Sequence, residues 1–167
     1  MSDLKAILSG KIGAREAKSI ARSDNKEELF RLLLDSDKRT SDNAAWALTH
    51  LPKAANAWFT EKQDALIDEA MLTTNTTKLR LILNLLTRTT FRRDSIRTEF
   101  LDFCFSKMLS NDPVGVKTLA IKLAHAQCLH YPELHDEFDA TLQLLNAEQL
   151  PPALRCIRHR MLKTNDE

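Results

Sequence analysis

The chain has 167 residues and a formal net charge of +1, and only three of its residues are glycine. Average usage would give roughly twelve glycines, so few positions favour a positive φ. That scarcity disfavours β-barrels, β-sandwiches and phosphate-cradling loops. A composition of 43% hydrophobic and 28% charged residues is typical of one globular domain. The near-zero net charge by itself implies no class of partner.

The three cysteines predict an intracellular protein with reduced thiols. The cysteines are odd in number, and gaps of 24 and 28 residues separate Cys104, Cys128 and Cys156. Because no Cys-x-x-Cys pair is present, neither a zinc ribbon nor a thioredoxin-like site is indicated. The N-terminal segment carries charges throughout, and no stretch approaches the ~18 uncharged apolar residues of a membrane span. We therefore expect a cytoplasmic protein that does not enter a membrane.

Apolar residues recur at helical spacing along almost the whole chain, and Pro, Asn and Asp residues separate the runs. A longer connection over 52–60, with Trp58 and Phe59, leaves room for one extra turn. Asp112-Pro113 predicts a helix start with Asp112 as the N-cap and proline in the first turn. The predicted helix pairs are 3–9/13–22, 25–35/39–50, 61–72/76–89, 94–110/113–129 and 132–146/150–164.

The pairs repeat with a period near 37 residues. Similar segments begin at Asn43, Leu79, Val116 and Leu154, and the preceding helices end at Leu33, Met71, Met108 and Leu144. A helical hairpin of this length cannot bury its apolar face alone, so neighbouring hairpins must stack. We expect an all-α fold, a right-handed α-solenoid of about five antiparallel helix pairs. The predicted organisation is one domain over 1–167, with a short capping pair at 1–23 and repeats at about 24–53, 60–92, 94–130 and 132–165.

This pattern resembles the HEAT-like (armadillo-type) repeat family. The matching feature is a polar residue in the inter-helix turn, then an aliphatic-basic pair opening the second helix, then a small or aliphatic residue. Asp112, Val116-Lys117 and Ala120 match best, Leu79-Arg80 and Leu154-Arg155 match in part, and Asn43-Ala44 lacks the basic residue. The resemblance implies a binding scaffold with the second helices on its concave face. A minority of the family binds nucleic acid, including a DNA-glycosylase branch.

The stretches AAWALTHLP, EFLDFCFSKML and VKTLAIKLAHAQCLHYPEL are also similar to short bacterial HEAT-like chains that are sometimes labelled adenylosuccinate lyase. That lyase fold needs a much longer chain, and its flexible Gly-Ser-Ser signature loop is absent from this sequence. We therefore expect no lyase activity from this resemblance.

The balanced net charge conceals a strong segregation. Windows over the second helices (11–22, 42–53, 76–93, 113–126 and 151–163) hold 16 of the 24 Lys and Arg residues but only two acids, Glu16 and Asp42. These windows therefore carry +14, and the remainder of the chain carries −13. A basic concave face would attract an acidic protein segment, nucleic acid or a phosphate-bearing ligand.

The expected partner-binding residues occupy this basic layer. Arg15, Arg80, Lys117 and Arg155 hold equivalent positions in the repeats, and Lys122, Arg158 and His159 flank them. A second interpretation remains open, in which these cations bond turn carboxylates of the repeats or complement the helix dipoles. Within the binding interpretation an acidic protein segment is favoured over nucleic acid, because few aromatic residues are available to stack on bases.

No recognisable catalytic or metal motif is present, so we expect no catalytic residue, metal or cofactor. The pattern His125-x-x-Cys128-x-His130 lacks a second ligand pair, and a buried cysteine beside surface histidines explains it better than zinc. Trp46 and His50 share one helix face, where Trp46 either fills the core or anchors a peptide. A glycosylase would need a carboxylate beside such an aromatic residue.

Two hypotheses follow. The favoured one is a non-enzymatic scaffold that holds an anionic partner, and the alternative is a nucleic-acid-binding protein of the HEAT-like DNA-glycosylase type; an enzyme of another class is a remote third. The last helix also carries Leu154, Ile157, Met161 and Leu162. If these side chains are uncovered, the C-terminal helix pair is a candidate homodimer surface.

Overall fold

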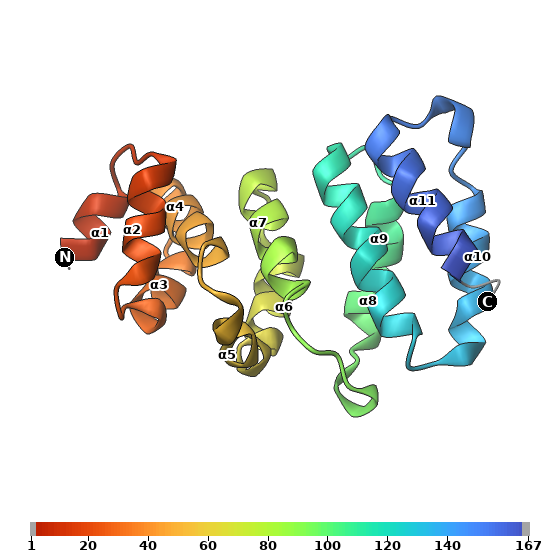
Figure 1. Cartoon of the computed structure of the whole chain (residues 1–167), viewed down its shortest axis with the longest axis horizontal. Helices are drawn as coiled ribbons and strands as arrows, with labels where there is room; N and C mark the ends of the chain where they lie inside the picture. The colour runs from red at the N-terminus through yellow and green to blue at the C-terminus, as the bar shows by residue number, and fades with distance from the viewer. Residues whose placement is uncertain (1–2, 165–167) are drawn as a thin grey trace. The chain divides into compact units, whose positions relative to one another are not determined.

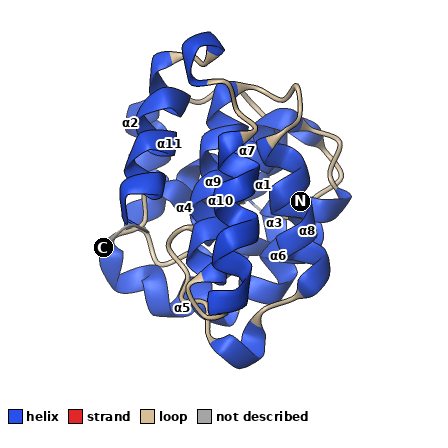
Figure 2. Cartoon of the chain, turned by 90° about the vertical axis from the view of Figure 1, so that its right-hand side faces the viewer, coloured by secondary structure: helices blue, strands red, loops and turns tan. Residues whose placement is uncertain are grey.

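The structure is a computed structural model that describes residues 3–164. This part of the chain holds eleven α-helices and no strand, which confirms the all-α fold (Figure 2). The chain divides into two compact units, 1–89 and 90–167, and each is described by itself.

The first unit contains three helix pairs and one short additional helix. The second helices, α2, α4 and α7, form one layer, because α4 packs against both α2 and α7 (Figure 1). The first helices α3 and α6 each pack on the second helix of their own pair. The elements are α1 (Asp3–Leu8), α2 (Ala14–Arg22), α3 (Lys26–Leu33), α4 (Lys38–Thr49), α5 (Asn56–Glu61), α6 (Gln63–Leu72) and α7 (Thr76–Leu86).

Small residues explain the central position of α4. Ala44, Ala45 and Ala47 are fully buried, and their short side chains let neighbouring helices approach closely. Ser41 is also buried, and its hydroxyl donates to the Leu33 carbonyl at the end of α3. A helix with apolar or small residues on most of its faces belongs between other helices, and α4 contacts α1, α2, α3 and α7.

The connection predicted over 52–60 holds more structure than one turn. A 3₁₀ turn (Lys53–Ala55) leads directly into α5, and α6 then begins at Gln63. Trp58 and Phe59 of α5 are buried. The Trp58 indole Nε1 donates to Glu27 Oε1 at 2.6 Å, which ties α5 to α3.

The second unit contains the last two helix pairs. Helix α9 packs against α8, α10 and α11, so it holds the unit together. Phe100, Cys104 and Met108 of α8 are fully buried and repeat every four residues, which places them on one face. The elements are α8 (Thr98–Met108), α9 (Val114–Cys128), α10 (His135–Gln143) and α11 (Pro152–Thr164), with 3₁₀ turns at Arg93–Ser95, Pro132–Leu134 and Ala147–Gln149.

The predicted N-cap of α9 is wrong. Pro113 is the N-cap of α9 and Val114 its first residue, so Asp112 does not cap the helix. Its carboxylate is bound instead by the Lys107 ammonium at 3.1 Å, at the end of the preceding helix. A hydrogen bond from Ser110 is the main cause that lowers the pKa of Asp112, and the bond from Lys107 adds to it.

Candidate functional site

The C-terminal helix carries a hollow of about 450 Å³ that brings together three of the predicted binding residues. Arg155, Arg158 and His159 of α11 line it. Leu154 and Ile157 of the same helix are buried inside the unit, and the residues that follow each of them lie toward the outer side. The remaining lining residues are Ala147, Pro152 and Cys156.

Backbone carbonyls position both guanidinium groups without neutralising them. Arg155 Nη2 donates to the Leu150 carbonyl and Arg158 Nε to the Leu142 carbonyl, each at 3.0 Å. Within residues 3–164 neither arginine forms an ion pair. A guanidinium has five N–H donors, so each keeps most of its donors for a further acceptor. The hollow therefore holds two arginine side chains that no described carboxylate neutralises.

The two predicted lysines of the second unit lie on α9, the helix that packs on α11. Lys122 is exposed, whereas Lys117 is half-buried. Lys117 adds a minor electrostatic contribution to the lowered pKa of Asp112, behind the hydrogen bonds from Ser110 and Lys107. Lys117 is therefore close to a turn carboxylate, although Lys107 forms the ion pair.

The predicted residues of the first unit lie on three neighbouring helices. Arg15 of α2 and Arg80 of α7 are exposed, and within residues 3–164 neither has a hydrogen-bond or ion-pair partner. Trp46 of α4 is half-buried and lies against His50, with 6.0 Å between the ring centroids. Burial, and secondarily the charge of Lys18, lowers the pKa of His50. Trp46 is thus neither a fully buried core residue nor a fully exposed anchor.

Two other cations of the basic layer have structural roles. Lys78 is buried and pairs with Glu69 at 2.5 Å. Arg88 donates to Asn56 Oδ1 at 2.8 Å and to the Pro52 carbonyl at 2.7 Å, and lies over the Phe59 ring. These two side chains are engaged inside the fold, so the segregated charge overstates the cations available to a partner.

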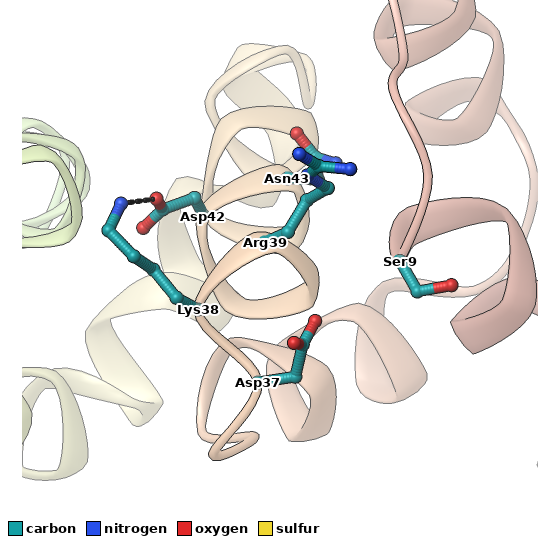
Figure 3. Close-up of a pocket in the computed structure, with 6 residues that line it drawn as sticks. All are labelled: Ser9, Asp37, Lys38, Arg39, Asp42 and Asn43. Carbon is teal, nitrogen blue, oxygen red and sulfur yellow. Dashed lines mark hydrogen bonds and ion pairs between the residues drawn. The ribbon is translucent and has the colours of Figure 1, made fainter.

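Sequence reasoning missed two cations at the start of α4. The helix begins at Lys38, four residues before the window used for the charge count, so Lys38 and Arg39 fell outside it. A hollow of about 480 Å³ lies here, and Figure 3 shows Lys38 turned toward Asp42 while Arg39 lies beside Asn43. Lys38 pairs with Asp42 at 2.7 Å, whereas Arg39 has no ion-pair partner within residues 3–164. The hydrogen-bonded N-cap Asp37 could have located this helix start.

The second helices offer no carboxylate suited to glycosylase chemistry among the described residues. Asp42 lies one turn before Trp46, but it accepts hydrogen bonds from Lys38 and from Asn75 Nδ2 at 2.6 Å. The aromatic–carboxylate pair that does exist, Trp58 with Glu27, joins α5 to α3. Trp58 is only 8% exposed, so its ring face is closed to a base.

The histidine-cysteine pattern of α9 forms core contacts. Cys128 is buried and half-buried His125 packs against Phe138, with 5.6 Å between the ring centroids. Burial is the largest cause that lowers the pKa of His125. Across residues 3–164 no group of three or more His, Cys, Asp and Glu side chains is arranged to hold a metal ion.

The comparisons with known proteins give one match. A family model described as a HEAT repeat domain matches residues 4–165. No curated protein and no solved structure matches the chain. None of the helices in the described part combines the length and apolar character that a membrane crossing requires.

Proposed function

Because the chain belongs to the HEAT repeat family, we propose that it is a non-enzymatic interaction scaffold whose basic surface binds an acidic segment of a partner protein. Helical repeats stack into extended surfaces that suit this role. The observation that supports the binding chemistry is the α11 hollow, which Arg155, Arg158 and His159 line. Among residues 3–164 no ion pair neutralises either arginine. Planar guanidinium groups fit carboxylates with paired hydrogen bonds.

The partner's acidic side chains would enter this hollow first. Arg155 and Arg158 are already oriented by the Leu150 and Leu142 carbonyls, so little side-chain entropy remains to be lost on binding. Lys117 and Lys122 on α9 would extend the contact within the second unit, and Arg15 and Arg80 would offer a separate basic surface in the first unit. Trp46 and His50 are the proposed aromatic anchor.

Several finer expectations belong to this proposal. We place the protein in the cytoplasm and expect a protein partner rather than a membrane. Of the four apolar residues of α11 considered for self-association, Met161 and Leu162 are half-buried. Leu154 and Ile157 are already covered within the unit.

The test is a fluorescence-anisotropy titration of a labelled deca-glutamate peptide into the full chain at low and moderate salt. We expect wild-type binding to weaken with salt and Arg155→Gln/Arg158→Gln to bind at least about tenfold more weakly. Lys53→Gln/Arg92→Gln removes the same charge from exposed positions outside the hollow and serves as the control. Equal affinity of the two double variants would overturn the proposal.

Nucleic acid is the competing ligand in the same experiment. A labelled deoxythymidine decamer carries similar negative charge but offers bases and phosphates. Tighter binding of the decamer, with an affinity that falls steeply with salt, would favour the nucleic-acid alternative. Preference for the peptide would support the acidic protein segment.

A further inference from the structure

The second unit contains a separate hollow with the opposite charge. It has a volume of about 430 Å³ and lies where α8, the 3₁₀ turn Pro132–Leu134 and α10 meet. Such a volume is within the ~300–1,000 Å³ typical of ligand pockets. The lining residues are Ile96, Thr98, Leu101, Asp102, Phe105, Tyr131, Glu133, Leu134 and Glu137.

Five of the nine residues that line this hollow are apolar or aromatic. Leu101 is buried, and Ile96, Leu134, Phe105 and Tyr131 are half-buried. Each of the two aromatic side chains has a contact within the unit that fixes its position. Phe105 packs edge-on against the Phe138 ring at a centroid distance of 6.4 Å, and the Tyr131 hydroxyl donates to the Arg93 carbonyl at 2.8 Å. The walls are therefore preformed.

Three carboxylates surround these apolar walls. Asp102, Glu133 and Glu137 are all exposed, and within residues 3–164 none of them has a hydrogen bond or ion pair to its side chain. Glu133 and Glu137 are four residues apart, and Asp102 reaches the same hollow from α8. Three unpaired negative charges beside five apolar or aromatic side chains favour a cation that can bring an apolar stem with it.

We propose that this hollow, the acidic pocket, binds an arginine side chain of a basic segment in a partner protein. The aliphatic stem of arginine fits the apolar walls, and its guanidinium combines carboxylate pairing with stacking on an aromatic ring. Tyr131 already accepts such a contact inside the chain, because the Arg93 guanidinium lies 5.4 Å from its ring centroid. The acidic pocket is lined by different residues from the α11 hollow and does not depend on the function proposed for that hollow.

The direct test is calorimetric titration of the full chain with a capped hexa-arginine peptide, compared with the neutral isostere hexa-citrulline. We expect binding of the arginine peptide only. Asp102→Asn/Glu133→Gln/Glu137→Gln should weaken it at least about tenfold. The control Glu61→Gln/Asp94→Asn/Glu148→Gln removes three exposed carboxylates elsewhere and should change affinity less than about twofold.

A second variant separates pocket binding from simple charge attraction. Thr98 is exposed and lines the acidic pocket, so Thr98→Trp should fill space in the pocket while leaving every carboxylate in place. We expect Thr98→Trp to weaken peptide binding about tenfold, and thermal melts to show that all variants stay folded. Equal weakening by the two triple variants, or wild-type affinity in Thr98→Trp, would overturn the proposal. Sedimentation gives a further check. If the wild type is a dimer and the pocket triple variant is a monomer, a second copy of this chain occupies the pocket and the proposal is overturned.

Discussion

Lys78 Nζ lies 2.5 Å from Glu69 Oε1, and the two side chains are only 8% and 19% exposed. The ion pair joins the last turn of α6 to the first turn of α7. Removing the cation would leave a poorly hydrated carboxylate behind, which is why breaking a buried pair costs more than the pair itself contributes.

Lys78→Met is therefore expected to lower the free energy of unfolding by about 2–3 kcal/mol. Lys38→Met removes a lysine whose side chain is 70% exposed, and its partner Asp42, although only 16% exposed, keeps the hydrogen bond from Asn75. This variant should therefore cost less than about 1 kcal/mol. Urea unfolding followed by circular dichroism measures both. A similar cost for the two variants would show that the Lys78–Glu69 pair has no special structural role.

Asn75 has two structural roles at the start of α7. Its Oδ1 caps the helix by accepting from the Thr77 and Lys78 amides, and its Nδ2 donates to Asp42 on the neighbouring helix α4. Asn75→Ala should cost about 1–2 kcal/mol of unfolding free energy. Asn75→Asp keeps the cap but sets a second carboxylate against Asp42, so we expect it also to destabilise the fold. Wild-type stability of Asn75→Asp would contradict the contact with Asp42.

The stability of the fold should fall as the pH drops below 6.5. The pKa of His125 is lowered from its ordinary value of 6.5, chiefly by burial and then by the charge of His135, with Asp139 opposing. Because the unfolded chain then takes up a proton before the folded one does, the contribution of His125 is complete above pH 6.5 and is lost as pH falls through the folded pKa.

Urea unfolding at pH 7.5, 6.5 and 5.5 measures this effect. His125→Phe keeps the aromatic contact with Phe138 and removes the titrating group, so its unfolding free energy should change less over this range. The pKa of Asp35 is lowered from its ordinary value of 3.8, mainly by its hydrogen bond with Lys5. Protonation of such a carboxylate changes the unfolding free energy only below pH 3.8, outside the range of this experiment. A wild-type slope in His125→Phe would argue against the burial account.

The fold was largely predictable because its main signal is local and repeated. A period near 37 residues and apolar spacing were enough to locate the helix pairs. Asp112 was misplaced because local sequence shows an acid before a proline, whereas the competing partner, Lys107, is revealed only by the turn geometry. The extent of α5 was also missed, since the six residues Asn56–Glu61 contain too little periodicity to distinguish a helix from a turn.

The candidate site was only partly predictable, because charge in a sequence does not reveal its partners. Arg88 and Arg155 both look like basic residues of second helices. In the structure Arg88 binds Asn56 and the Pro52 carbonyl, whereas Arg155 lines an open hollow. The acidic pocket combines residues 96–105 with residues 131–137, and the approach of these two segments is seen only in the folded chain.

The three thiols should differ sharply in reactivity. Burial is the main cause that raises the pKa of Cys104 to about 12 and that of Cys128 to about 11. Cys156 is exposed on α11. Because only the thiolate is a strong nucleophile, iodoacetamide should modify Cys156 in the native protein and the other two after unfolding. Mass spectrometry identifies the modified residue, and rapid native labelling of Cys104 would contradict the packing of α8.

Cys156 lines the same hollow as Arg155 and Arg158, so it reports on the central claim. The most direct measurement is the rate of Cys156 alkylation by uncharged iodoacetamide, with and without saturating deca-glutamate peptide. The account predicts that bound peptide slows Cys156 modification severalfold in the wild type, and that deca-glutamine at the same concentration does not. An unchanged rate while anisotropy shows the peptide fully bound would place the acidic segment elsewhere and contradict the account.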